Sequence, residues 1–84
     1  MRYEVIISKS VRKTIKRLPV ATTSRIWDSI DALEMNPRPH GAIKLQGIAA
    51  YRIRVGDLRI IYEIHDKQLI VVVAEVGNRR DIYR

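Results

Sequence analysis

The chain lacks cysteine and long apolar runs. Without cysteine, neither disulfide bonds nor thiolate metal sites can form. The longest apolar run, residues 69–74, is strand-sized and far short of the roughly 18 residues that a membrane-spanning helix needs. Residues 1–7 lack the charged-then-apolar layout of a secretory signal peptide. These absences predict a cytoplasmic protein, and we expect no membrane partner.

Repeats, linkers and low-complexity segments are also absent, and a length of 84 residues corresponds to one domain, residues 1–84. The two histidines, His40 in a proline-rich loop and His65 at a predicted strand end, lie too far apart to suggest a paired-histidine nuclease site. The carboxylates form no metal-binding group, and neither a Walker loop nor a dinucleotide fingerprint occurs. We therefore expect no metal and no cofactor.

The chain has an excess of positively charged residues. Its 16 lysines and arginines against 9 aspartates and glutamates give a formal net charge of +7 and a pI near 10.3. Such a balance predicts attraction to a polyanion, such as nucleic acid, an anionic membrane or an acidic protein. A protein that is basic and merely soluble is the alternative interpretation.

The first half of the chain is typical of a strand followed by two helices. Residues 2–7 form the predicted strand, and Ser8 or Ser10 can cap the first helix by accepting a backbone N–H. That helix has one apolar stripe and ends at Pro19. The stripe consists of Val11, Ile15 and Leu18.

A second helix is predicted from about residue 22 to residue 35. Its candidate caps are Thr22, Thr23 and Ser24. Its predicted buried side carries Ile26, Trp27, Ile30 and Leu33. Neither helix is long enough to stand alone, so both must pack against the rest of the chain.

The second half is typical of a sheet. Strands are predicted over residues 51–55, 58–65 and 68–76, which alternate in polarity or are rich in β-branched side chains. Gly56 and Asp57 form a two-residue turn of type II′, and Asp66 and Lys67 form a second turn. The predicted fold class is α+β: an N-terminal strand, a helical hairpin, then an antiparallel meander of three to four strands with the helices packed on one face.

The turn at residues 56 and 57 fixes the register of the first hairpin and places Arg54 opposite Arg59. Residues directly opposite each other point to the same side of a sheet. One side is then apolar and should meet the helices: Tyr51, Ile53, Val55, Leu58, Ile60 and Tyr62. The other, exposed side carries Arg52, Arg54 and Arg59. The second turn extends this register and places Arg59 opposite Ala74 and Ile61 opposite Val72.

These arginines are hard to explain as scaffold, because like charges directly opposite in a sheet cost up to about 1 kcal/mol. Arginine forks match phosphate oxygens in two-point contacts, so the pattern indicates a phosphodiester-binding face. Beyond the last strand, Arg79 can join the cluster and Tyr83 can follow. The alternative is a structural network in which carboxylates neutralise the arginines. The candidates for this are Asp57, Glu63 and Glu75.

Further cations are candidates for contacts with an RNA backbone. Five lie on the predicted first helix: Lys9, Arg12, Lys13, Lys16 and Arg17. The RNA- or ribosome-binding set is completed by Lys44, Arg80 and Arg84. For the helix, an ordinary solvated face is almost as good an explanation.

Two segments resemble the RelE toxins of the RelE/ParE superfamily. Residues 51–62 hold the arginine-bearing hairpin, and residues 76–83 hold the final Gly-Asn-Arg-Arg and the tyrosine. The helix at residues 8–18, followed by Pro19, also fits the family. The motif that precedes the hairpin in the family looks like Lys44, Leu45, Gln46 and Gly47. The resemblance covers nearly the whole chain.

The resemblance implies a type II toxin, an endoribonuclease (mRNA interferase) that enters the ribosomal A site and inhibits translation. It cleaves mRNA without a metal, by attack of a ribose 2′-hydroxyl on the neighbouring phosphate. The family's basic pair falls on Arg52 and Arg54, and its phosphate-stabilising arginine on Arg59. A candidate proton donor falls on Arg79, and the tyrosine that orients base and ribose on Tyr83. A cognate acidic antitoxin is implied as partner, in a hetero-oligomer.

The best-studied family pattern has lysines where Arg52 and Arg54 stand. Lysine can lose its proton when buried near other cations, whereas arginine effectively cannot. The general base is therefore open: Tyr83 beside several cations is one candidate. Catalysis resting mostly on charge stabilisation and on the ribosome holding the mRNA in line is the other. Two other functions stay open, a ParE-like toxin that inhibits DNA gyrase and a non-catalytic RNA-binding module.

Overall fold

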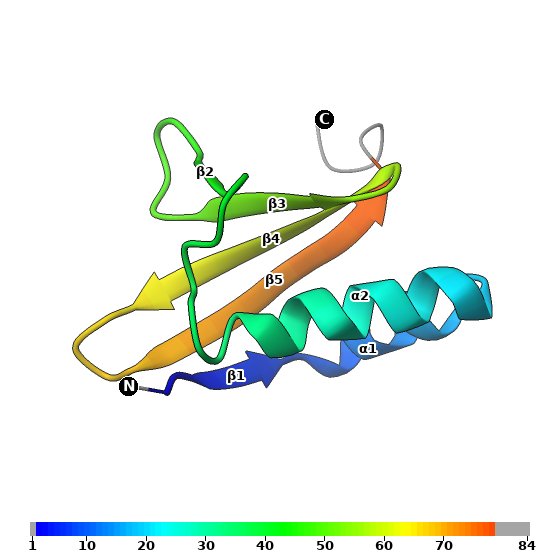
Figure 1. The fold of residues 1–84 in the computed structure, drawn as a ribbon, viewed down its shortest axis with the longest axis horizontal. Helices are drawn as coiled ribbons and strands as arrows, with labels where there is room; N and C mark the ends of the chain where they lie inside the picture. Colours follow the sequence, from blue (N-terminus) through cyan, green and yellow to red (C-terminus); the bar gives the residue numbers. More distant parts are fainter. Residues whose placement is uncertain (1, 79–84) are drawn as a thin grey trace.

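The computed structural model describes residues 2–78, which form a five-stranded sheet and two helices (Figure 1). The elements in chain order are β1 (Glu4–Ile7), α1 (Lys9–Lys16), α2 (Val20–Ala32), β2 (Ile43–Lys44), β3 (Tyr51–Val55), β4 (Leu58–His65) and β5 (Ile70–Asn78). The strand order is β1-β5-β4-β3-β2, in which β1 and β5 are parallel and the other pairs antiparallel. The predicted α+β fold class is confirmed, with β2 as a short fourth strand of the C-terminal half.

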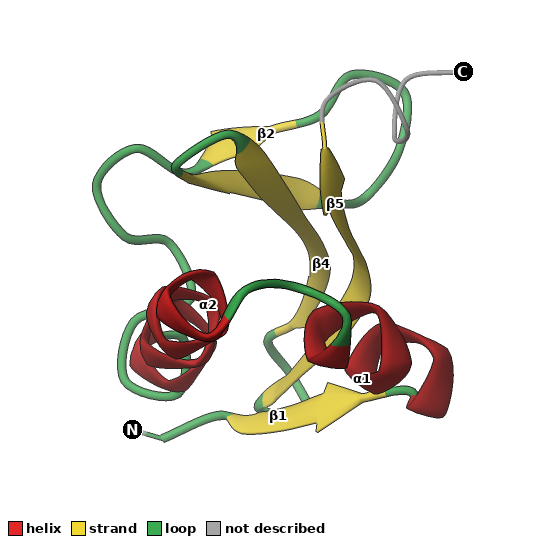
Figure 2. Cartoon of the chain, turned by 90° about the vertical axis from the view of Figure 1, so that its right-hand side faces the viewer, coloured by secondary structure: helices red, strands yellow, loops and turns green. Residues whose placement is uncertain are grey.

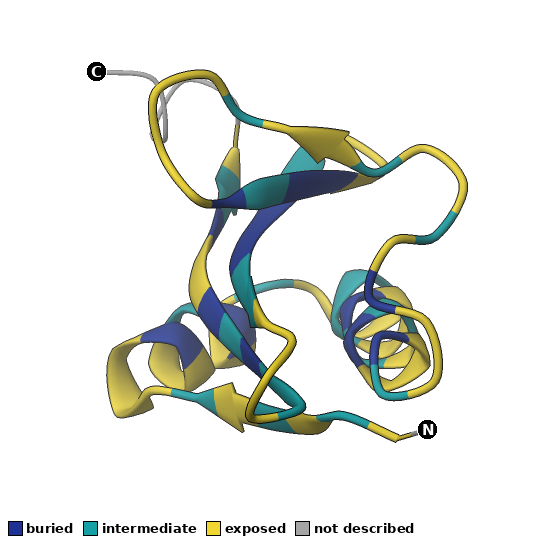
Figure 3. Cartoon of the chain, turned by 90° about the vertical axis from the view of Figure 1, so that its left-hand side faces the viewer, coloured by how far each residue is buried: buried dark blue, intermediate teal, exposed yellow. Residues whose placement is uncertain are grey.

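Both helices lie on the same side of the sheet, next to each other (Figure 2). Buried residues occur in both helices and in the three long strands β3, β4 and β5 (Figure 3). The core cluster consists of Val11, Ile15, Ile26, Ile30, Leu33, Ile53, Val55, Ile60, Tyr62, Val71, Val73 and Val76. Among residues 2–78, neither helix has the length and apolar character to cross a membrane.

The first helix, α1, forms as predicted. Ser8 is its N-cap residue, and the Ser8 Oγ accepts a hydrogen bond from the Val11 N–H at 3.2 Å. Val11 and Ile15 are buried, which confirms the apolar stripe. The helix ends at Lys16, just before Pro19.

The second helix, α2, begins earlier than predicted, at Val20, and its N-cap residue is Pro19. The expected caps at residues 22–24 are wrong, because these residues already lie inside the helix. There the Thr23 hydroxyl donates to the Val20 carbonyl at 2.8 Å. The physical reason is that proline is pre-organised for a helix start, since its fixed φ suits the entry and it needs no N–H partner. Pro19 thus separates the two helices, ending one and starting the other.

The β3–β4 hairpin has the predicted register. Arg54 lies opposite Arg59, and Val55 opposite Leu58, across a tight turn. Gly56 in this turn has φ of 59°, which glycine adopts without strain. The side chains expected to meet the helices are buried or partly buried against the core.

The predicted register of β5 against β4 is wrong. Residues 66–69, rather than a two-residue turn, separate β4 from β5. Leu69 adopts the left-handed conformation with φ of 55°, and its N–H donates to the Asp66 carbonyl at 3.2 Å. The chain therefore reverses direction over four residues, and β5 starts later than expected. The loop shifts the pairing by two residues, since His65 lies opposite Ile70 rather than opposite Gln68. With the further shift described next, Arg59 lies opposite Gly77 rather than opposite Ala74.

A β-bulge in β5 shifts the register once more. Tyr62 pairs with Val73 and Ile61 pairs with Glu75, so that Ala74 is an extra residue without a partner on β4. An extra residue reverses which side chains face each side of the sheet beyond it. The bulge therefore turns Glu75 to the side away from the helices, since Glu75 lies directly opposite Ile61.

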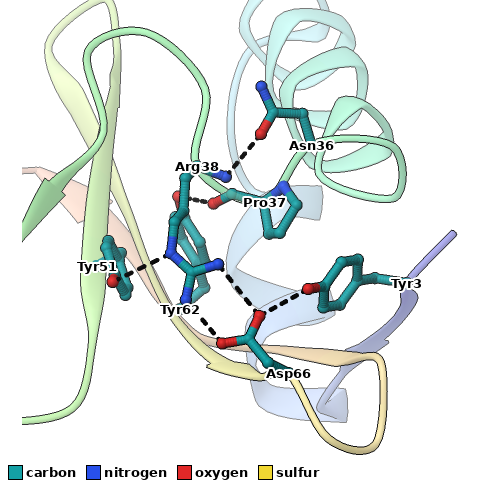
Figure 4. A network of polar contacts seen from close by, with 7 residues as sticks. All are labelled: Tyr3, Asn36, Pro37, Arg38, Tyr51, Tyr62 and Asp66. Carbon is teal, nitrogen blue, oxygen red and sulfur yellow. Dashed lines mark hydrogen bonds and ion pairs between the residues drawn. The ribbon is translucent and has the colours of Figure 1, made fainter. Parts of the chain in front are cut away.

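A network of polar contacts ties the loop after α2 to the sheet (Figure 4). The Arg38 guanidinium binds Asp66 through two hydrogen bonds, Nη1 to Oδ1 at 3.1 Å and Nη2 to Oδ2 at 2.8 Å. The Tyr3 hydroxyl donates to the same Asp66 Oδ1 at 2.6 Å, and Arg38 Nε donates to the Tyr51 hydroxyl at 3.2 Å. The network thus joins the residue before β1, the strand β3, the loop after α2 and the loop between β4 and β5.

The buried Tyr62 strengthens the same corner of the sheet. Its hydroxyl donates to the Pro37 carbonyl at 2.7 Å. Burial raises the pKa of Tyr62 to about 12, so the phenol stays protonated and remains a donor at neutral pH. Its ring stacks on that of Tyr51 with the centroids 6.0 Å apart.

The Asp66 contacts predict a pH-dependent stability. Hydrogen bonds from Arg38, and then from Tyr3, lower the pKa of Asp66 from 3.8 to about 2. A folded-state pKa below the unfolded one stabilises the protein above the unfolded pKa, and this is lost as the pH falls toward 2. The melting temperature of Asp66→Asn should therefore be lower than that of the wild type at pH 7 and change less between pH 5 and pH 2. Parallel melting curves for the two proteins across this range would contradict the assignment.

Candidate nucleic-acid interface

The side of the sheet away from the helices carries three arginines on adjoining strand positions. We call these residues the arginine face: Arg52, Arg54 and Arg59. Arg54 and Arg59 share a row with Gly77 of β5. The next row holds Arg52, Ile61 and Glu75. The hairpin part of this site is as predicted, and the β5 part is new.

The arginine face is less exposed than predicted. Arg59 is only 4% exposed and Arg52 only 8%, whereas Arg54 is exposed. The prediction that Arg54 and Arg59 share an exposed surface is therefore wrong for Arg59. Long arginine stems can lie along apolar neighbours. Arg52 has such neighbours on both sides, since it lies directly opposite Ile43 of β2 and Ile61 of β4.

Arg52 also has an unused hydrogen-bond donor. Its Nε is buried and has no hydrogen-bond partner among residues 2–78. Leaving a buried donor unpaired costs free energy, on the order of 1–3 kcal/mol and more for charged groups. Unpaired buried groups in native proteins call for an explanation, and one of these is a ligand that supplies the acceptor.

The ion-pair alternative finds little support among the described residues. Glu63 pairs instead with His65, with 3.0 Å between Oε1 and Nε2. Within residues 2–78, no salt bridge joins Arg52 or Arg54 to a carboxylate. Both arginines thus keep their charge available for an anion from outside the chain.

Four predicted site residues lie outside the described residues. They are Arg79, Arg80, Tyr83 and Arg84. Their assignments remain predictions. The described part of the site ends at Asn78, the last residue of β5 and the neighbour of Leu58.

The cations of α1 do not join the arginine face. The helix packs through Val11 and Ile15 against the opposite side of the sheet. Its lysines and arginines are exposed. The Arg12 guanidinium lies 5.7 Å from the ring centroid of Trp27, which engages this cation within the protein. Lys44 of β2 is exposed too, but it lies opposite Tyr51 and thus on the helix side of the sheet.

The arrangement can bind and stabilise a phosphate. Guanidinium groups stay charged at any physiological pH and offer two parallel donors to phosphate oxygens. Those held in a partly buried site act at lower dielectric and need little reorganisation, which favours developing negative charge. Residues 2–78 contain no group of three or more side chains suited to binding a metal ion.

Comparison with known proteins assigns the family. The model of the ParE toxin family of type II toxin–antitoxin systems matches residues 5–83. This chain belongs to the RelE/ParE superfamily of toxins. A RelE-like toxin protein of Escherichia coli is 33% identical over 99% of this chain and 92% of its own length. The toxin protein RelE1 of Methanocaldococcus jannaschii is 26% identical over 100% of this chain and 98% of its own length.

Solved structures of RelE toxins share this fold. The RelE–RelB complex from Pyrococcus horikoshii contains a chain that is 35% identical, with a TM-score of 0.85 over 94% of this chain and 97% of that one. A variant of the Escherichia coli toxin RelE in the free state superposes with a TM-score of 0.81 at 21% identity, over 98% of this chain and 88% of that one. The protein is therefore a RelE-type toxin of a type II toxin–antitoxin system.

Glu75 was not predicted as a site residue and was named only as one of the carboxylates that could neutralise the arginines. With a two-residue turn at Asp66 and Lys67, the predicted register puts Glu75 opposite Leu58, on the helix side of the sheet. In the structure the buried valines change from odd to even positions around Ala74, but residues 70–74 are all apolar, so the sequence has no alternation there that could have revealed the bulge. Glu75 is exposed and shares its row with Arg52.

Proposed function

We propose that this RelE-type toxin is a cytoplasmic endoribonuclease that cleaves mRNA in the ribosomal A site. One observation carries the proposal: Arg52 and Arg59 are buried on the same side of the sheet, where Arg52 Nε has no hydrogen-bond partner among the described residues. A toxin that acts only by binding a protein has no need of such a buried, unpaired donor. A phosphate oxygen, in contrast, would accept a hydrogen bond from Arg52 Nε.

In this mechanism the arginine face holds the scissile phosphate. The 2′-oxygen of the preceding ribose attacks phosphorus, and Arg59 and Arg52 stabilise the charge that develops on the phosphoryl oxygens. Arg54, which is exposed, binds the neighbouring backbone. Arg79 and Tyr83 are proposed to act on the leaving oxygen and on the base. The ribosome supplies the alignment of attacking and leaving oxygens.

The exposed cations of α1 and Lys44 are proposed to contact ribosomal or messenger RNA backbone. They lie on the side of the sheet away from the arginine face. Arg80 and Arg84 are proposed to make similar contacts. Such contacts strengthen binding without selecting a sequence, and each one lost should lower the salt dependence of binding.

The direct test uses purified toxin, ribosomes programmed with a defined mRNA, and mapping of the fragments. We expect cuts within the A-site codon, with 2′,3′-cyclic phosphate and 5′-hydroxyl ends, and no cutting of the same mRNA free in solution. Cleavage should survive brief chelation of metal ions when magnesium is restored to keep the ribosome intact. Intact mRNA on programmed ribosomes would contradict the proposal.

A second candidate function has a specific observation in its favour, because the family model that matches residues 5–83 describes ParE toxins. A ParE-like toxin inhibits DNA gyrase and needs no nuclease site. Supercoiling of plasmid DNA by gyrase measures this activity. We expect supercoiling to proceed unchanged in the presence of the toxin.

An acidic antitoxin is the proposed partner. The toxin has a net charge of +7, and its relative from Pyrococcus horikoshii was solved as a complex with RelB. A segment that is disordered when free can wrap a large surface as it folds onto a toxin. Co-expression with the protein encoded beside the toxin should yield a tight hetero-oligomer and abolish toxicity. A harmless isolated toxin, with no neighbouring protein that binds it, would contradict the pairing.

A further inference from the structure

The arginine face as described lacks a group that can accept a proton. Attack by a 2′-hydroxyl requires that its proton be taken up, and arginine stays protonated at physiological pH. A carboxylate within reach of the phosphate would complete the site. The β-bulge at Ala74 brings one there, because beyond the bulge Glu75 points to the same side of the sheet as Arg52 and Arg59.

Glu75 lies close to the phosphate-binding arginines. Arg59 pairs with Gly77, two residues along β5, so Glu75 is its diagonal neighbour in the sheet. Diagonal neighbours in an antiparallel pair lie about 7–8 Å apart, which is close enough for two long side chains to contact one group between them.

Glu75 is also open to a substrate strand. It is exposed, and β1 ends opposite Val73, so no strand formed by residues 2–78 covers the edge of β5 beyond that point. A groove of about 580 Å³ runs along this edge, with Glu75, Gly77 and Asn78 on one wall and residues of α1 on the other. The groove thus leaves Glu75 accessible from the open edge of β5, while the register puts its side chain on the side of the sheet that carries the arginines.

A carboxylate at this position weakens phosphate binding, so its presence calls for a functional explanation. A negative charge beside the arginine face repels the phosphate that the arginines attract. Glu63 of β4 points to the same side of the sheet, but its carboxylate is paired with His65. Glu75 makes no salt bridge within residues 2–78.

We infer that Glu75 is the general base of the cleavage reaction, an inference that rests on the proposed function. The Glu75 carboxylate takes the proton of the 2′-hydroxyl as the 2′-oxygen forms its bond to phosphorus. The bond between phosphorus and the 5′-oxygen breaks, and the 5′-oxygen leaves with the electron pair and takes a proton from water. Glu75 then returns its proton to solvent. The products are a 2′,3′-cyclic phosphate and a 5′-hydroxyl, with no net consumption of water.

The test measures single-turnover cleavage on programmed ribosomes at several toxin concentrations, for the wild type, Glu75→Gln, Glu75→Asp and the control Glu63→Gln. We expect Glu75→Gln to lower the maximal rate by about 100-fold or more, since general bases contribute about 10²–10⁴. Its half-saturating concentration should stay the same or fall, because a repulsive charge is gone. Glu75→Asp should keep an intermediate rate. Glu63→Gln removes an equal charge from the same side of the sheet and should cut as the wild type does.

The outcomes separate this inference from the function on which it rests. A Glu75→Gln protein that cuts within about threefold of the wild-type rate overturns the inference and leaves the proposed function standing. An equal loss in Glu75→Gln and Glu63→Gln also overturns it, because that pattern belongs to charge and not to proton transfer. A wild type that cuts no mRNA overturns both. Because Glu75 is exposed, its variants should melt as the wild type does, which is checked on the same samples.

Discussion

Replacing Arg59 with glutamine is expected to reduce cleavage of ribosome-bound mRNA by at least about 100-fold, the loss typical of removing one preorganised donor from a developing oxyanion. Arg59 is 4% exposed and held in the central hairpin, so its charge is positioned before the substrate arrives. Glutamine keeps some donor capacity but loses the positive charge. Cells that express Arg59→Gln should therefore grow, whereas cells that express the wild type should stop growing.

Two variants control for this result. Arg59→Lys retains the charge but loses the two-point contact, and we expect an intermediate rate. Arg25→Gln removes an exposed arginine on α2 and should cut as the wild type does. Two opposing effects act on the stability of Arg59→Gln. The variant loses the packing of the buried arginine stem, and it also loses the repulsion between the charges of Arg59 and Arg54. A melting temperature so low that Arg59→Gln is unfolded in the assay would show that Arg59 is a structural residue.

A single 2′-deoxyribose at the cut site is expected to abolish cleavage altogether. The proposed nucleophile is the 2′-oxygen of that nucleotide. The proposed mechanism uses no side chain of the protein as an alternative nucleophile. The phosphate and the base are unchanged, so the substituted mRNA should still compete with normal mRNA for the toxin on ribosomes. A deoxy substitution one codon upstream is the matched control and should leave cleavage at the original site intact. Cleavage of the deoxy site would show that water is the nucleophile.

The hairpin that carries the arginines could be predicted because its geometry is local. Gly56 and Asp57 define the turn, and a two-residue turn leaves only one register for the strands beside it. The pairing of Arg54 with Arg59 follows without any knowledge of the rest of the fold. The Ser8 cap and the buried stripe of α1 are local in the same sense.

The position of β5 could not be predicted because it depends on contacts distant in sequence. Asp66 is held by Tyr3 and Arg38, and Leu69 takes a positive φ that leucine rarely adopts. Together with the bulge at Ala74, this loop moves Arg59 from its expected partner to Gly77. Periodicity alone reports neither a loop conformation nor an inserted residue.

The burial of Arg52 and Arg59 was missed for a related reason. A residue on the side of a sheet away from the helices is expected to be exposed, and arginine is rarely buried. Here the short strand β2 extends the sheet beside Arg52, and isoleucines stand on both sides of it. β2 has two residues and carries too weak a pattern to be recognised in advance.

The order in which macromolecular synthesis stops after the toxin is induced in bacterial cells distinguishes mRNA cleavage from inhibition of gyrase. Incorporation of labelled methionine, thymidine and uridine is followed over the first minutes, with Arg59→Gln as the inactive control. We expect protein synthesis to fall first while DNA synthesis continues, and we expect all three to continue unchanged in cells that express Arg59→Gln. If DNA synthesis stops first while translation continues, mRNA is not the target and gyrase is.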